Sequence, residues 1–472
     1  MEAPEGRVVP IEVVPLAGYP AWRSAVPSHQ RAWADSSGFK AEAGAHLLLP
    51  DADGNAGAVL LVVEDPVGHE PGATPGRMWD YAGLPAGLPG GDYAYRSLPP
   101  AQAEKAAIGW MLGAYVFDRF KSPPKEAPRP KPRLVWPSSC DRAAALRVAR
   151  AASLARDLIT TPAENLGPAE LEQAVRAVAA MDESAFVTAI AGDALLAQGY
   201  PAVHRVGRAS TRPPRLIDLH WAAPGLRHDA PRVTLVGKGV CFDTGGLDLK
   251  SADGMKLMKK DMGGSAIVLA LAQMVINAKL PVRLRLLIPA VDNAVAGNAM
   301  RPMDVMTTRK GLTVEIGNTD AEGRLILCDA LAEACREKPD LLVDVATLTG
   351  AARVALGPDL PALFCDDETL AADILAAGRL EDDPLWRMPL HKPYRKLLDS
   401  KVADLNNVSD GPHAGAITAA LFLKDFVDPA VPWAHIDVLA WNLKPQRGRP
   451  EGGEAQTLRA LWRVLRQRFG RA

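Results

Sequence analysis

The fold is decided by a stretch that reads VTLVGKGVCFDTGGLDLKSADGMKLMKKDMGGSA, residues Val233–Ala266. Its apolar start predicts a strand that ends at Gly237, and its apolar end predicts a helix that begins near Gly264. The Gly-rich passage between them carries the charged residues Lys238, Asp243, Lys250 and Asp261. Charged side chains that follow the carboxyl end of a strand lie where open α/β sheets place their ligand sites. The stretch therefore predicts an α/β protein with a ligand site at the edge of its sheet.

A second stretch of the same kind is NTDAEGRL, residues Asn318–Leu325. It lies between a predicted strand over Thr313–Ile316 and a predicted helix over Gly323–Cys335. Asp320 and Glu322 are two residues apart, so in extended backbone their side chains would project the same way and could reach one metal ion. Gly323 would relieve crowding where the chain turns into the helix.

Each of these acids also has a plain structural explanation. Asp261 could be the N-cap of the helix that follows it, a position that favours Asp. Asp320 and Glu322 could be acids in a first helical turn, where the helix dipole favours negative charge. The functional interpretation gains weight because acids and bases gather after predicted strand ends in both stretches.

Motif absences narrow the chemistry of the predicted site. The nine histidines are scattered and form no HExxH, so a zinc site built on histidine is not expected. Any metal here would be held mainly by carboxylates, which suit hard or borderline divalent ions. The phosphate-loop pattern GxxxxGK[ST] is absent, which argues against nucleotide binding.

Strands and helices alternate along the rest of the chain, which predicts two α/β domains. The larger C-terminal domain, which carries the predicted ligand site, is expected to have a central mixed β-sheet flanked by helices, and the smaller N-terminal domain is also α/β. The expected boundaries are 1–137 for the N-terminal domain, 138–160 for a connecting helix and 161–472 for the C-terminal domain. A basic, Pro-rich stretch over 121–133 is expected to be a surface loop.

Further elements follow from apolar runs and helical spacing. Predicted strands are Ala45–Leu49, Ala58–Val63, Leu134–Trp136, Pro214–His220, Arg232–Val240, Val282–Ala290 and Leu341–Val345. Predicted helices are Ala101–Phe120, Asp141–Leu158, Ala169–Ala180, Gly264–Asn277, Ala416–Phe426 and Ala455–Phe469.

Composition excludes several classes of protein. Among 472 residues 48% are apolar and 23% charged, which excludes a disordered chain. The net charge of -1 gives no electrostatic reason to expect nucleic acid or an anionic membrane as the main partner. The five cysteines form no CxxC and are odd in number, so we expect no disulfide framework and a cytoplasmic location. We expect no signal peptide and no membrane span.

The octapeptide NTDAEGRL resembles the signature of the leucyl aminopeptidases, dinuclear metallo-exopeptidases of family M17 that are also called cytosol aminopeptidases. Further blocks occur in the family's order: VGKG, FDTGG, DMGGSA, GNAMRP, ATLTGA (Ala346–Ala351) and DLNNVSDGPHAGAITAALFLKDF (Asp404–Phe426). The resemblance runs from roughly residue 150 to the C-terminus, and the N-terminal third matches loosely. The chain is therefore expected to be a metal-dependent aminopeptidase.

The resemblance implies a role for each site residue. Asp243 and Glu322 would each bridge two metal ions, and Asp320 would complete the first site. Lys238 and Asp261 would complete the second site. The catalytic residues that bind no metal would be Lys250 and Arg324, and Arg324 would hold a bicarbonate that acts as the general base.

These implied roles are physically coherent. Two divalent ions about 3.5–4 Å apart can share a water and lower its pKa toward neutrality. Lys238 could bind a metal only as the neutral amine, so burial and the cations must depress its pKa. One metal could bind the free α-amine of the substrate, and the Lys250 ammonium could stabilise the oxyanion. Carboxylates with one amine accept Zn²⁺ or Mn²⁺, and also Mg²⁺ or Co²⁺.

The resemblance also implies a pocket for the N-terminal side chain of the substrate. Its lining would include Met258, Thr347 and Gly350, while Thr347 and Leu348 would offer backbone groups to the peptide. Leu439 and Asn442 stand where the family has a small alanine and a methionine, and such changes shift specificity by about 1–3 kcal/mol per misfit methylene. A preference for leucine is therefore not predicted. Met303 stands where the family usually has Gly, and the sequence offers no reason for it.

The family forms homohexamers with active sites that face an interior cavity, which implies short peptides as substrates. Two alternatives remain open at this stage. A DNA-binding or regulatory protein is one, and its only support is the basic loop Lys121–Arg133. A carboxylate-metal hydrolase that acts on phosphate esters is the other.

Overall fold

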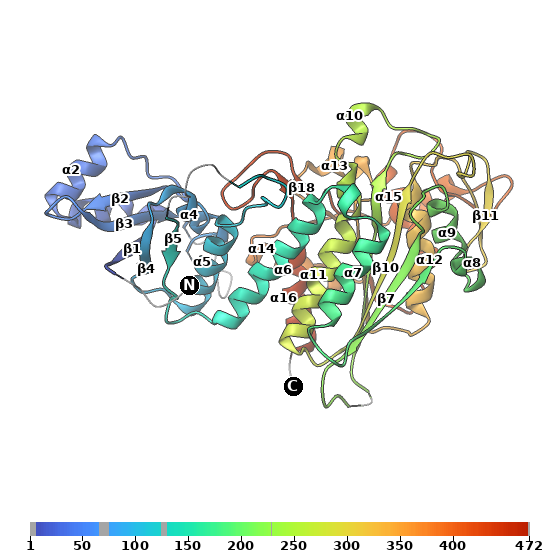
Figure 1. The fold of residues 1–472 in the computed structure, drawn as a ribbon, viewed down its shortest axis with the longest axis horizontal. Coiled ribbons are helices and arrows are strands. Elements are labelled where there is room, and N and C mark those ends of the chain that lie inside the picture. Colours follow the sequence, from blue (N-terminus) through green and yellow to red (C-terminus); the bar gives the residue numbers. More distant parts are fainter. Residues whose placement is uncertain (1–5, 66–74, 124–129, 228, 471–472) are drawn as a thin grey trace. The chain divides into compact units, whose positions relative to one another are not determined.

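A computed structural model describes residues 6–65, 75–123, 130–227 and 229–470. The chain forms two compact units (Figure 1). The first comprises Met1–Ser153 with Lys444–Glu451, and the second comprises Leu154–Leu443 with Gly452–Ala472. The boundary near residue 153 falls inside helix α6 (Arg142–Thr160). Both units are α/β, so the predicted fold class is confirmed.

The first unit is built on a five-stranded sheet of order β2-β3-β1-β4-β5. All its strand pairs are parallel except β2–β3. The central strands are buried on both faces, as expected for a mostly parallel sheet. The strands are β1 (Val8–Pro15), β2 (His46–Pro50), β3 (Ala56–Val63), β4 (Gly91–Tyr95) and β5 (Pro132–Leu134).

Two expectations for this unit need correction. Helix α5 (Pro100–Gly113) is shorter than the predicted Ala101–Phe120, because the chain leaves the helix after Gly113. The predicted loop 121–133 includes residues 124–129, which lie outside the described part of the chain, and its last two residues belong to β5. Pro132 is tolerated as the first residue of an edge strand, and Arg133 Nε lies 2.7 Å from Asp92 Oδ1 on β4.

The second unit is built on a mixed sheet of order β15-β14-β17-β13-β8-β10-β7-β6, in which β9 also pairs with β10. The four central strands β17, β13, β8 and β10 run parallel to one another. The outer strands β7, β6 and β14 pair antiparallel. The strands are β6 (Phe186–Ala191), β7 (Arg215–Ala222), β8 (Arg232–Gly237), β9 (Gly239–Asp243), β10 (Arg283–Asn293), β13 (Leu341–Ala346), β14 (Ala362–Phe364), β15 (Trp386–Arg387) and β17 (Trp433–Asp437).

Helices cover both faces of this sheet (Figure 1). One face carries α7 (Pro168–Ala179), α11 (Gly263–Ala278) and α16 (Leu458–Phe469). The other carries α9 (Pro201–Gly207), α12 (Glu322–Cys335) and α15 (Gly415–Lys424), which form one apolar core with β8 and β10. A small separate sheet joins β11 (Val305–Thr307) and β12 (Thr313–Glu315), which precede α12, to β16 (Leu405–Asn406), which follows it, and supports the loop that leads from β12 into α12.

One helical stretch in the described residues, Ala252–Ala278, is long and apolar enough to cross a membrane by length and composition. However, 83% of its most apolar window is buried inside the fold. Such burial is typical of a core helix that is covered on all sides.

The predicted strand Arg232–Val240 is divided at Lys238 into β8 and β9. This interruption positions Lys238 at the edge of the sheet where the charged residues gather. The Lys238 N–H donates to Val345 O on β13 at 3.1 Å, after which the chain shifts sideways as β9 to pair with β10. Gly237 allows the start of α11 to pack closely, because a Cβ there would lie 2.5 Å from the Ser265 Cα. The carboxyl ends of β8, β13 and β17 thus meet at one edge, where open sheets bind ligands.

Candidate metal centre and substrate pocket

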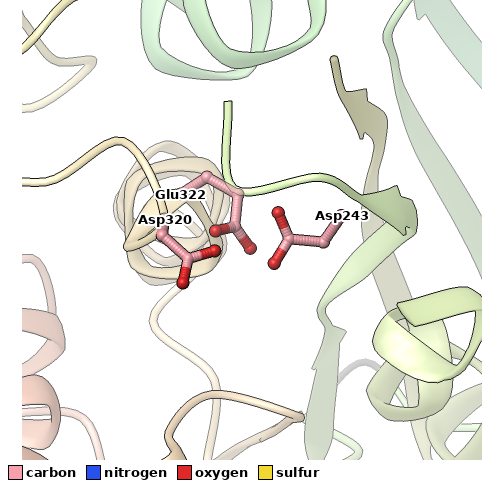
Figure 2. Close-up of side chains that lie close together, drawn as sticks. All are labelled: Asp243, Asp320 and Glu322. Atoms are coloured by element: carbon pink, nitrogen blue, oxygen red, sulfur yellow. The ribbon is translucent and has the colours of Figure 1, made fainter. Parts of the chain in front are cut away.

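Three carboxylates converge at this edge of the second unit. Asp243 ends β9, Asp320 lies in the turn before α12, and Glu322 is the first residue of α12. One oxygen from each lies within 4.8 Å of the others, and the three side chains point toward one another (Figure 2). The predicted extended backbone at Asp320 and Glu322 is wrong, because the chain makes a turn there, but the two carboxylates do reach one point.

Lys238 and Asp261 form a buried half of the cluster. Lys238 Nζ lies 2.7 Å from Asp261 Oδ2 and 2.9 Å from Glu322 Oε1. Asp261 lies in the short 3-10 helix η3 (Met258–Met262), and its Oδ1 accepts a hydrogen bond from Thr347 Oγ1 at 2.8 Å. The N-cap of α11 is Met262, without a side-chain cap, so Asp261 does not cap that helix.

Gly323 makes room for this buried lysine. A Cβ at Gly323 would lie 2.5 Å from Lys238 Cε and 2.7 Å from its Nζ. The crowding predicted at this glycine is therefore real, but its source is the side chain of Lys238 rather than the turn itself.

Lys250 forms a more open half with the remaining acids. Its Nζ lies 2.8 Å from Asp243 Oδ2 and also contacts Asp320 Oδ1. Asn293, at the end of β10, donates from Nδ2 to Asp243 Oδ1 at 2.8 Å and so fixes that carboxylate. The Lys250 side chain is 15% exposed and that of Asp320 32%, whereas the Lys238 side chain is 4% exposed.

The clustered acids shift one another's pKa. Burial and the charge of Asp243 raise the pKa of Glu322 to about 8, and the same two causes raise that of Asp320 to about 6. Burial alone would lower the pKa of Lys238, but the charges of Asp261, Glu322 and Asp243 raise it above its usual value. Lys250 follows the same pattern, so in the cation-free protein both lysines are ammonium ions.

The donor set fits divalent cations. Asp261 Oδ2, Asp320 Oδ1 and Glu322 Oε1 are buried oxygens that, within the described residues, meet only lysine ammonium groups and accept no well-aligned hydrogen bond. Buried carboxylates carry a large desolvation cost that nearby positive charge must offset. Oxygen ligands with a single amine suit hard or borderline divalent ions.

Arg324 lies beside the cluster in the first turn of α12. It is buried, and its Nη1 donates to Asn407 O at 2.7 Å, while its Nε has no partner among the described residues. Burial lowers its pKa to about 10, so it remains a cation near neutral pH and cannot act as a base there.

A cavity of about 430 Å³ opens next to the acids. Five of the predicted substrate-binding residues line it: Met258, Thr347, Leu348, Gly350 and Leu439. Asn442 is not among the lining residues, and its Nδ2 donates to Glu454 Oε2 at 2.7 Å. The side-chain amide of Asn442 is therefore hydrogen-bonded in the core and does not contribute to the lining of the cavity.

Several residues around the site were not found from the sequence. Asp437, at the end of β17, accepts from the Leu348 N–H at 2.9 Å and from Thr349 Oγ1 at 2.6 Å, which fixes the loop after β13. The Asn407 amide holds the octapeptide loop through Asn318 O at 2.7 Å. Lys260 is buried and lines the cavity. A strand that ends in a charged or amide residue is the only sequence signal that could have pointed to Asn293 and Asp437.

Met303 also receives an explanation. Its φ is 69°, a left-handed conformation that favours glycine, and this accounts for the Gly expected there from the resemblance. Its side chain is 76% exposed, so the substitution strains the backbone without crowding a neighbour.

Comparison with known protein families matches both units. The description "Cytosol aminopeptidase family, catalytic domain" matches residues 153–462, and "M17 aminopeptidase, N-terminal domain" matches residues 9–137. A probable cytosol aminopeptidase of Rhodococcus jostii is 42% identical over 375 residues, which are 76% of this chain and 73% of the relative. One of Roseiflexus castenholzii is 38% identical over 78% of this chain and 77% of the relative.

Solved structures agree with these sequence matches. The cytosol aminopeptidase from Coxiella burnetii matches with a TM-score of 0.90 and 46% identity, and the match covers 98% of both chains. The bottromycin maturation enzyme BotP in complex with Mn matches with a TM-score of 0.82 and 35% identity over 98% of each chain.

Proposed function

This chain belongs to the cytosol aminopeptidase family and is a peptidase, and we propose that it removes the N-terminal residue of short peptides with two divalent ions at the carboxylate cluster. The observation that carries the proposal is the meeting of two distant stretches of chain, in which Asp243 joins Asp320 and Glu322 within 4.8 Å. Lys238 and Asp261 extend this cluster by direct ion contacts.

The five residues that would hold the ions are Lys238, Asp243, Asp261, Asp320 and Glu322. When bound, the ions supply an activated water and a Lewis acid for the scissile carbonyl. Lys238 can serve as a ligand only as the neutral amine, so loading the site requires it to lose a proton. Zn²⁺ and Mn²⁺ are the proposed ions, and the manganese complex of BotP supports the second.

Two further residues act on the substrate in this proposal. Lys250 lines the cavity and is partly exposed, so its ammonium can turn from the acids to the substrate carbonyl and donate a hydrogen bond to the oxygen on which charge develops. Arg324 would hold a small anion such as bicarbonate through its Nε, which has no partner within the described residues, and that anion would accept a proton. Asp320, the most exposed acid of the cluster, would favour a substrate with a free α-amine.

Assembly and location complete the proposal. We propose a homohexamer in the cytoplasm, in keeping with the family's name and with five cysteines that are all free in the structure. Interior active sites would restrict substrates to short peptides. We do not propose a nucleic-acid function, because the family matches and the named relatives give it no support.

The test is metal removal followed by re-addition. The chelated enzyme should lose hydrolysis of leucine p-nitroanilide and regain it with Mn²⁺ or Zn²⁺, while the N-acetylated substrate and p-nitrophenyl phosphate should stay uncleaved. Glu322→Gln should prevent recovery, and Glu337→Gln, an exposed acid beyond the end of α12, should recover as the wild type does. Full activity after chelation, or faster cleavage of the phosphate ester, would refute the proposal.

A further inference from the structure

One lysine that lines the pocket has no polar partner among the residues that the structure describes. Lys260 lies in η3, next to Asp261, and is 6% exposed, with its side chain lining the cavity. Within the described part of the chain, its ammonium makes no hydrogen bond and no ion pair. A buried charge without a partner is strongly unfavourable, so the fold retains it at a cost.

The neighbouring lysines show that this is unusual for the site. Lys238 and Lys250 each contact two carboxylates. Lys259 donates to Thr160 O at 2.6 Å and lies over the ring of Trp441. Among the lysines that line the cavity, Lys260 is the one that has no such contact within the described residues, so its ammonium is available to a ligand that enters the cavity.

The acids closest to Lys260 are already engaged. The charges that act on its ammonium are those of Asp261, Lys238, Asp437 and Arg353. Asp261 faces Lys238 and the Thr347 hydroxyl. Both oxygens of Asp437 accept hydrogen bonds from the loop at Leu348 and Thr349.

A second cation reinforces the first. Arg353, on α13 (Gly350–Leu356), also lines the cavity, and it too has no ion pair in the described residues. The lining of the same cavity also includes the apolar Leu360 and Leu439. The cavity therefore offers two kinds of contact to a substrate side chain. The aliphatic part of the side chain could contact the leucines, and a negatively charged end group could contact the two cations.

We propose that Lys260 is a specificity-determining residue that selects peptides with an acidic N-terminal residue, glutamate or aspartate. The inference rests on the proposed aminopeptidase function and names its substrate class. A substrate carboxylate would form a charge-assisted hydrogen bond with the ammonium and end its isolation. A leucine side chain would leave the ammonium buried and unpaired, and sites that hold unpaired polar groups discriminate strongly against such substrates.

The test compares p-nitroanilides of Glu, Gln, Leu and Lys on the metal-loaded enzyme. We expect kcat/KM for Glu to exceed that for its neutral isostere Gln by at least tenfold, with Lys the poorest. Lys260→Met should reduce the Glu-to-Leu ratio of kcat/KM by at least tenfold, and Lys260→Glu should shift preference toward Lys. Lys256→Met, an exposed lysine in the same segment that does not line the cavity, should leave the ratio as in the wild type.

The outcomes separate the two proposals. Cleavage of Leu at a rate equal to or above that of Glu, or an unchanged ratio in Lys260→Met, would overturn the acidic preference while the aminopeptidase function stands. Cleavage of none of the four substrates would overturn the aminopeptidase function itself. Product inhibition of the wild type needs no variant: free glutamate should inhibit at a concentration at least tenfold lower than leucine, and equal inhibition contradicts the role of Lys260.

Discussion

Two lysines in the site make the same contacts in different surroundings. Lys238 and Lys250 each lie between two carboxylates at ion-pair distance. Lys238 and its two acids have side chains at most 4% exposed, whereas Lys250 is 15% exposed and one of its acids 32%. Burial makes the two ion contacts of Lys238 difficult to break, because breaking them would leave unpaired charges buried away from water. The second pair borders the cavity, so Lys250 can exchange an acid for a substrate oxygen.

The largest expected effect tests the buried half. Lys238→Met removes the amine ligand and leaves Asp261 and Glu322 without their cation. We therefore expect the loss of at least one bound ion and a fall in kcat/KM of well beyond roughly 100-fold. That figure is the upper range for the loss of a residue that only supports a metal ligand. Metal content after gel filtration and peptide hydrolysis would be measured together. Normal metal content with normal activity would show that Lys238 is only a structural ion-pair partner.

A smaller and different loss is expected in the open half. Lys250→Met should lower kcat by about 10²–10³-fold, the usual cost of removing one donor to a developing oxyanion. Its metal content should stay at the wild-type value, because Lys250 is not a proposed ligand. Steady-state kinetics and elemental analysis give both quantities. Loss of the ions from Lys250→Met would show that Lys250, like Lys238, is required for metal binding, and would contradict the distinction between the two lysines.

The site residues could be predicted because they follow strands that the sequence makes evident. Lys238 follows the apolar run of β8, and the octapeptide lies between β12 and α12. The residues that hold them in place come from distant strands whose apolar pattern is interrupted by buried polar residues. β17 reads WAHID, and its polar His435 is buried because it pairs with Asp344 on β13 at 2.6 Å. A residue pair of this kind is invisible until the strands are aligned.

The same limit applies to the first unit. β1 was not predicted, although it lies at the centre of its sheet. Its sequence VVPIEVVP carries Pro10 in mid-strand, and proline argues against a central strand. Packing on both faces overrides that local preference, since Ile11 is buried in the core on one face of the sheet and Val14 in the core on the other. Local sequence rules therefore indicated the cluster of charged residues more readily than the scaffold around it.

Next in size is an effect of pH on the metal-free and metal-loaded protein. Glu322 and Asp320 have pKa values raised to about 8 and about 6, so the folded metal-free protein holds protons that the unfolded chain has released. Stability of the chelated protein should therefore fall as the pH rises from 6 to 8. Both lysines stay charged throughout this range and do not alter the sign.

Metal affinity should change in the opposite direction over the same range. Cations displace the protons on these carboxyls, so apparent affinity should rise by about tenfold per pH unit for each proton displaced. Calorimetric melting at pH 6, 7 and 8, with chelator and with Mn²⁺, tests both trends. Parallel curves for the two forms would mean that the acids are not the metal ligands.

The smallest expected effect concerns the residues behind the ligands. Thr347→Val removes the hydroxyl that donates to Asp261 Oδ1 at 2.8 Å while it keeps nearly the same volume. Loss of such a partner weakens metal binding by about 10–100-fold, and we expect the lower figure because Lys238 still contacts the other oxygen of Asp261. Thr234→Val, a buried threonine within β8, is the matched control and should bind Mn²⁺ with unchanged affinity. Competition with a metal-sensitive dye measures both affinities. An equal affinity for Thr347→Val and the wild type would mean that burial, rather than the hydrogen bond, fixes Asp261, and the buried half would then owe its rigidity to Lys238 alone.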